Sequence, residues 1–110
     1  MKVLKSLIGS GPRAKILLYL SVYKESYPRE LTINLRLPLF GVQSQLKNLL
    51  KSGIILVRKD ANRNMFRFNP DHVLRKELLA LLKKAMAHFP EKERAIFYKP
   101  KLTPRSTLKK

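Results

Sequence analysis

Polar and basic side chains recur at helical spacing in the segment 40–52, and their types suit hydrogen bonding to nucleic acid. One face of a helix over this segment would be buried, because its apolar residues are spaced by four, three and one: Val42, Leu46, Leu49 and Leu50. Glutamine and asparagine amides can pair with adenine edges, and lysine pairs with guanine or phosphate. The residues predicted to lie on the outer face are Gln43, Ser44, Gln45, Lys47, Asn48 and Lys51.

Position along this helix separates the predicted base contacts from the predicted phosphate contacts. The early residues of a recognition helix reach base edges most readily. Gln43, Ser44 and Lys47 are therefore the predicted base-reading residues. Asn48 and Lys51 are predicted to contact phosphates. Any solvent-facing side of a helix also carries these residue types, so a plain solvated face remains the alternative.

Acidic residues are absent from the whole stretch around this helix. Between Leu31 and Lys59 there is no Asp or Glu, whereas five residues are Lys or Arg. The chain as a whole has 24 Lys and Arg against 7 Asp and Glu, a formal net charge of +17. Such an excess repels itself unless a polyanion is near. This favours nucleic acid, with an anionic membrane surface second and a lysine-rich solvated surface as the plain alternative.

Patterns typical of catalysis and metal binding are missing from the sequence. There is no nucleophile–base pair and no glycine-rich phosphate loop. There is also no cysteine, which excludes disulfides and thiolate sites. His72 and His88 are 16 residues apart on one predicted helix, too far to hold one ion within a subunit. We therefore expect a protein that is not an enzyme and that takes no metal or cofactor.

Periodicity and turn residues predict the elements that position the polar face. Helices are expected at 2–8, 11–23 and about 28–36, before the recognition helix at 40–52. The third helix should stop before Pro38, because proline disfavours helix at the residue that precedes it. The sequence thus predicts that three helices precede the recognition helix.

A β-hairpin is predicted at 54–68, with a polar turn between a β-branched run and an alternating run. Its basic side chains are predicted to lie on phosphates or in the minor groove: Arg58, Lys59, Arg63 and Arg67. The alternative is that these charges only protect an edge strand from aggregation. Arg29, in the third helix, completes the predicted DNA-binding set.

A long helix predicted at 71–89 carries more apolar surface than one small domain can bury. The surplus predicts an isologous homodimer, with burial inside a single chain as the alternative. The residues predicted to form the dimer interface are Leu4, Leu74, Leu78, Leu82 and Met86. We place the DNA-binding domain, including this helix, at 1–89. Residues 90–110 are basic and poor in apolar residues, so we expect an extended, flexible tail.

The order of these segments resembles a known family. The matching stretches are Leu7-Ile8-Gly9-Ser10, Tyr27-Pro28-Arg29-Glu30-Leu31, Leu37-Pro38-Leu39-Phe40-Gly41-Val42-Gln43, Ser52-Gly53-Ile54 and Phe66-Arg67-Phe68-Asn69-Pro70. The chain resembles the ArsR-like winged-helix transcription regulators, in their short bacterial and archaeal branch. The resemblance implies a mainly α winged helix-turn-helix with a small β-hairpin, a homodimer built from terminal helices, and duplex DNA as ligand. Metal-sensing members use Cys or His clusters that this chain lacks.

The predicted function is sequence-specific binding of double-stranded DNA by a transcription regulator. A nonspecific architectural DNA-binding protein, an RNA-binding or ribosome-associated protein, and a module that binds a separate protein are the alternatives. RNA binders usually display exposed aromatic rings, whereas Tyr19, Phe40, Phe66 and Phe68 occupy positions predicted for the core. The apolar runs are shorter than the ~20 residues of a membrane span, and no signal-peptide pattern is present, so we expect a cytoplasmic protein.

Overall fold

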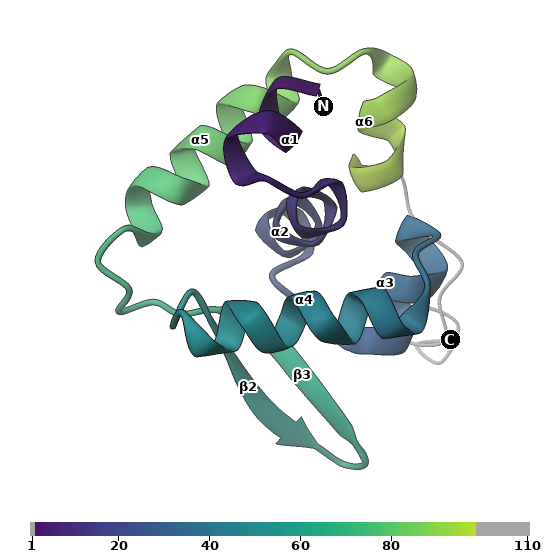
Figure 1. The fold of residues 1–110 in the computed structure, drawn as a ribbon, viewed down its shortest axis with the longest axis vertical. Helices are drawn as coiled ribbons and strands as arrows, with labels where there is room; N and C mark the ends of the chain where they lie inside the picture. Colours follow the sequence, from purple (N-terminus) through teal and green to yellow (C-terminus); the bar gives the residue numbers. More distant parts are fainter. Residues whose placement is uncertain (1, 99–110) are drawn as a thin grey trace.

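The computed structural model describes residues 2–98 of the chain, and the side chains of residues 4–95 (Figure 1). The described part is mainly helical, with one small antiparallel sheet. Its elements are α1 (Lys2–Ile8), α2 (Gly11–Tyr23), β1 (Glu25–Ser26), α3 (Pro28–Leu35), α4 (Leu39–Lys51), β2 (Ile55–Asp60), β3 (Arg63–Phe68), α5 (Arg75–Ala87) and α6 (Glu91–Tyr98). The first four predicted helices and the predicted hairpin are confirmed, with boundaries shifted by a residue or two.

Helix α2 runs through the middle of the molecule and organises the core. Its residues Ala14 and Ile16 to Leu20 are all buried, a much wider face than an amphipathic stripe. The reason is that α2 is packed from several sides: α1, α5 and α6 lie above it in Figure 1, and α3 and α4 lie below it. Ser10 caps the start of the helix: its Oγ accepts a hydrogen bond from the backbone N–H of Arg13 at 3.2 Å.

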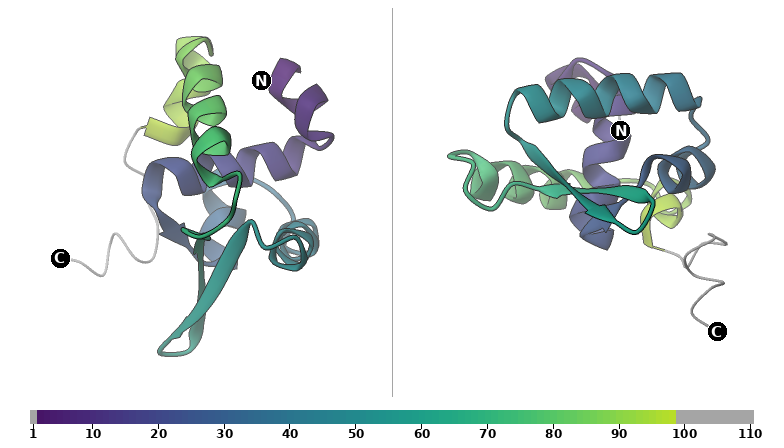
Figure 2. Two further views of the ribbon diagram at one scale, coloured as in Figure 1. Left: turned by 90° about the vertical axis from the view of Figure 1, so that its left-hand side faces the viewer. Right: turned by 90° about the horizontal axis from the view of Figure 1, so that it is seen from below.

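The sheet has the strand order β1-β3-β2, and both pairings are antiparallel. Strand β1 has two residues, too few to show a sequence pattern, and it was not predicted. At the base of the hairpin Ile55 pairs with Phe68, and both side chains are buried in the core. The outer half of the β2–β3 hairpin extends away from the helices (Figure 2). The hairpin is therefore anchored by apolar residues at one end and projects at the other.

The long C-terminal helix predicted at 71–89 is shorter in the structure. It begins at Arg75, because the residues before it form local turns. Asp71 does not cap it: its backbone N–H donates to Asn69 Oδ1 at 2.9 Å, and the N–H of Leu74 donates to His72 Nδ1 at 3.0 Å. These turns use the polar groups that a longer helix would have needed at its start.

The expectation of an extended tail from residue 90 onward is wrong for its first part. Residues 91–98 form α6, which packs against α2. Pro90 precedes this helix, and its carbonyl accepts the backbone N–H groups of Glu93 and Arg94 at 2.9 and 3.0 Å. Acidic side chains at Glu91 and Glu93 suit the positive end of the helix dipole. The rest of the predicted tail, residues 99–110, lies outside the described residues.

Membrane crossing would need a longer helix than this part of the chain contains. The longest helices between residues 2 and 98 have 13 residues. None of the described helices is long and apolar enough to span a bilayer.

Candidate nucleic-acid interface

Helix α4 buries one face and exposes the other, as its sequence predicts. Val42, Leu46 and Leu49 are fully buried, and α4 packs against α2, α3 and β2. Helix α3 precedes it and ends at Leu35, and the next residue, Arg36, adopts a left-handed φ of 56°. Leu37 and Pro38 then form the short connection, so that α3 and α4 make a helix-turn-helix pair.

The polar residues of α4 form one exposed surface, which we call the outer face. Five of the predicted DNA-contacting side chains lie on it, all of them exposed: Gln43, Ser44, Lys47, Asn48 and Lys51. Their spacing of three or four residues places them along one side of the helix. No acidic residue lies on α4. The outer face therefore presents hydrogen-bonding groups and positive charge without a competing carboxylate on the same helix.

Gln45 is the exception among the residues predicted for the outer face. It is half-buried, and its Oε1 accepts a hydrogen bond from Arg13 Nε at 2.8 Å. The position turns toward α2 because it falls beside the buried stripe of α4. Gln45 fixes α4 to the start of α2 and is a structural residue in this arrangement.

The prediction that Phe40 lies in the core is also wrong. Its ring is 82 % exposed at the start of α4, and the neighbouring Leu39 is 47 % exposed. Phe40 precedes Ser44 by four residues and Lys47 by seven, so it shares the outer face with them. The spacing from Ser44 and Lys47 therefore predicts that Phe40 lies on the outer face, whereas its apolar side chain alone suggests a core position.

Two arginines of the hairpin are engaged within the protein. Arg58 Nη2 donates to Glu25 Oε1 at 2.7 Å, and its Nε donates to Glu25 Oε2 at 3.3 Å. Asp60 lies 4.0 Å from the same guanidinium. The hydrogen bond with Glu25, supported by the negative charge of that carboxylate, raises the pKa of Arg58. Arg63 lies over the ring of Tyr27 at 4.4 Å from its centroid, a cation–π contact.

Lys59 and Arg67 are the exposed cations of the hairpin outside these two contacts. Lys59 pairs with Asn64 in the sheet register, and Arg67 is three residues beyond Asn64 on β3. Because side chains alternate along a strand, Lys59 and Arg67 point to opposite faces of the hairpin. A nucleic acid lying on one face would therefore meet only one of them. Arg29 is exposed on α3.

Comparison with known proteins supports the fold at low sequence identity. The chain is similar to the organohalide-sensing transcriptional regulator RdhR in its 2,4-dichlorophenol-bound form, with a TM-score of 0.56 and 21 % identity over 86 % of this chain and 61 % of that one. It is also similar to a MepR-like protein in complex with pseudoligands, with a TM-score of 0.55 and 15 % identity over 84 % and 82 %. This chain has a winged helix-turn-helix fold. No protein-family model and no curated protein matches its sequence.

In this winged-helix fold α4 is the second helix of the helix-turn-helix pair, and the β2–β3 hairpin is the wing. The chain spans less than two thirds of the RdhR chain. The ArsR-like resemblance gains no separate support, because the structural neighbours are regulators of the wider winged-helix type.

Three of the residues predicted for a dimer interface are core residues instead. Leu4, Leu82 and Met86 are buried within a single chain, because α1 and α5 both pack on α2. Leu78 is half-buried and Leu74 is exposed. The sequence pattern could not separate the residues that face α2 from those that face outward.

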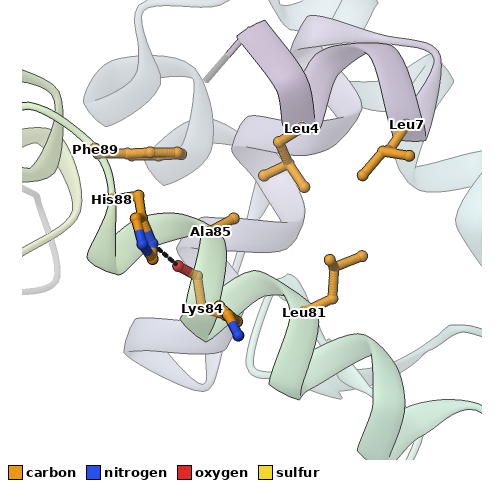
Figure 3. A pocket seen from close by; sticks show the side chains of 7 residues that line it. All are labelled: Leu4, Leu7, Leu81, Lys84, Ala85, His88 and Phe89. Carbon is orange, nitrogen blue, oxygen red and sulfur yellow. Dashed lines mark hydrogen bonds between the residues drawn. The ribbon is translucent and has the colours of Figure 1, made fainter.

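The apolar surface that remains near α1 and α5 lies around a hollow of about 370 Å³ (Figure 3). Leu7 on α1 is 66 % exposed, and Leu81 on α5 is 40 % exposed. The hollow is lined by Leu4, Leu7, Leu81, Lys84, Ala85, His88 and Phe89. We call this surface the α1–α5 groove.

Proposed function

We propose that this chain is a transcription regulator that binds double-stranded DNA, with α4 in the major groove and the wing on the adjacent backbone. The observation that carries the proposal is the outer face of α4, which is exposed, rich in amide and ammonium groups, and free of acidic residues. In a helix-turn-helix the second helix enters the major groove. The α3–α4 pair supplies that second helix, and the wing follows it directly.

Residue roles within this proposal follow from position and from existing contacts. Gln43, Ser44 and Lys47 contact base edges, since they lie in the first half of α4. Asn48, Lys51 and Arg29 contact phosphates. On the wing, Lys59 or Arg67 contacts the backbone according to which face meets the DNA. Arg58 and Arg63 act mainly by holding the wing in shape, because their guanidinium groups are already engaged.

The proposal includes a homodimer joined through the α1–α5 groove. Exposed Leu7 and Leu81 flank an apolar hollow that a second copy would cover, in place of the core residues first expected there. Two copies of α4 would then meet DNA at points about 34–36 Å apart, which favours an inverted-repeat site. Within the winged-helix regulators, the sequence motifs favour the ArsR-like branch.

RNA binding is the second candidate, and the exposure of Phe40 is the observation that favours it. RNA-binding modules stack unpaired bases on exposed aromatic rings. Phe66, Phe68 and Tyr19 are buried and do not offer such a surface. One exposed ring on a helix of the helix-turn-helix supports RNA less strongly than the whole outer face supports duplex DNA.

Enrichment of random duplexes on the purified protein, with structured RNA as competitor, tests the proposal. The expected result is a defined duplex sequence with two inverted half-sites. Salt should weaken binding steeply, with a slope of about −0.9 for each neutralised phosphate. Recovery of RNA in preference to any duplex would overturn the proposal.

A further inference from the structure

Phe40 has a large apolar side chain in a position that is open to solvent. Its ring is 82 % exposed, in the first turn of α4, although the core of the same domain accommodates Phe66, Phe68 and Phe89. Single exposed apolar residues are common on protein surfaces, so the position of Phe40 on α4, more than its exposure, indicates a partner. The question is which partner covers this position.

The position of Phe40 on α4 ties it to the outer face. Residues 40, 44, 47 and 51 follow one another at spacings of four, three and four, so their side chains lie in one row along the helix. Val42, Leu46 and Leu49 occupy the opposite side and are buried. Whatever lies against Ser44 and Lys47 therefore also lies against Phe40.

The proposed dimer surface is not adjacent to this residue. Helix α4 lies beside the wing, whereas α1 and the C-terminal half of α5 lie at the other end of the molecule (Figure 1). A second copy docked in the α1–α5 groove would leave Phe40 uncovered. The ligand of the outer face itself is the partner that reaches it.

We propose that Phe40 determines specificity by contacting the 5-methyl group of a thymine in the major groove. This inference rests on the proposed binding of duplex DNA by α4. The thymine methyl is the apolar group that the major groove presents, and phenylalanine is among the side chains that contact it. Phe40 lies in the first turn of the recognition helix, where side chains approach base edges most closely. Gln43, Ser44 and Lys47 supply the polar contacts, and Phe40 adds a requirement for thymine beside them.

Removal of a single methyl group from the DNA tests the proposed Phe40–thymine contact without changing the protein. In the duplex enriched on the protein, each thymine is replaced in turn by deoxyuridine, which lacks only the 5-methyl group. The wild-type protein should bind about fourfold more weakly when one particular thymine is replaced in either half-site, the effect expected for one methyl-sized apolar contact. Replacement of the other thymines should change its Kd little.

The Phe40→Ala variant should bind the thymine duplex more weakly than wild type and should lose the sensitivity at that one position. Val73→Ala is the matched control, because Val73 is 85 % exposed and lies outside α4 in the segment before α5. It should keep the wild-type profile.

Two results would overturn the inference while the proposed function stands: a wild-type protein indifferent to every thymine replacement, or a Phe40→Ala variant that keeps the wild-type profile. Failure to enrich any duplex would overturn both.

Discussion

Arg58 of β2 and Glu25 of β1 form an ion pair across the intervening strand β3, with 2.7 Å between Nη2 and Oε1. The pair joins the two edge strands of the sheet. It also holds an arginine that the sequence assigns to phosphates or to the minor groove. The basic residues of this wing thus divide into those with a partner inside the protein, such as Arg58, and exposed residues outside such contacts, such as Lys59.

That division predicts different salt dependences for neighbouring residues. Arg58→Ala should leave the slope of log affinity against log salt near its wild-type value, because the guanidinium is engaged by Glu25. If the wing meets DNA on the face that carries Lys59, Lys59→Ala should make the slope shallower by about one. Arg67→Ala serves as the control for the other face of the hairpin. A change in slope for Arg58→Ala as large as the larger of the changes for Lys59→Ala and Arg67→Ala would contradict the assignment.

Two buried tyrosines should respond in opposite ways to loss of the hydroxyl group. Among the described residues, Tyr27 Oη has no hydrogen-bond partner, so Tyr27→Phe should leave the free energy of unfolding unchanged or raise it by about 1 kcal/mol. Tyr19 Oη accepts from Asn34 Nδ2 at 2.7 Å, so Tyr19→Phe should lower it by about 1 kcal/mol. Denaturant unfolding of the two variants measures the difference. A matching loss of stability in both would refute the distinction.

Substitutions of two adjacent leucines of α5 should separate an effect on folding from an effect on dimer formation. Leu82 is fully buried, so Leu82→Ala should lower the free energy of unfolding by about 2–5 kcal/mol. Leu81 is 40 % exposed in the α1–α5 groove, so Leu81→Asp should produce a folded monomer. Sedimentation at tens of micromolar protein, with a thermal melt of each variant, reads both effects. A wild-type protein that sediments as a monomer under these conditions would count against the dimer.

Substitution of the proposed base-contacting residues of α4 should affect DNA binding differently from substitution of the proposed phosphate-contacting residues. Gln43→Ala or Lys47→Ala should cost about 1–3 kcal/mol on the preferred site and relax the sequence preference. Lys51→Ala should weaken binding to preferred and scrambled duplexes alike, since phosphates repeat at every step. If Gln43→Ala and Lys47→Ala lower both affinities equally, α4 does not read sequence. The chain would then be an architectural DNA-binding protein.

The fold could be predicted because its signals are local. Proline, glycine and apolar spacing define α2, α3 and α4 within a residue or two, and β-branched runs define the wing. The misassigned positions depend on tertiary contacts. Strand β1 exists only because Glu25 and Ser26 pair with β3. Leu82 and Leu81 look alike in the sequence, and only the packing of α5 on α2 makes one a core residue.

The candidate site shows the same limit. The polar residues of the outer face were predicted from their spacing, since amphipathic periodicity reports directly on exposure. Arg58 and Arg63 were assigned by charge alone, which cannot show that Glu25 and Tyr27 lie beside them. Phe40 was assigned to the core by its apolar character, although its spacing from Lys47 placed it on the outer face.

The most direct test of the central claim is a comparison of equilibrium binding to three ligands of equal length at one salt concentration. These are the enriched duplex, a scrambled duplex and a structured RNA hairpin. We expect the enriched duplex to bind about 10³-fold more tightly than the scrambled one, the lower end of the range for specific DNA-binding proteins. The RNA should bind no better than the scrambled duplex. RNA binding equal to or tighter than that of the enriched duplex would contradict the assignment of α4 as a DNA-reading helix.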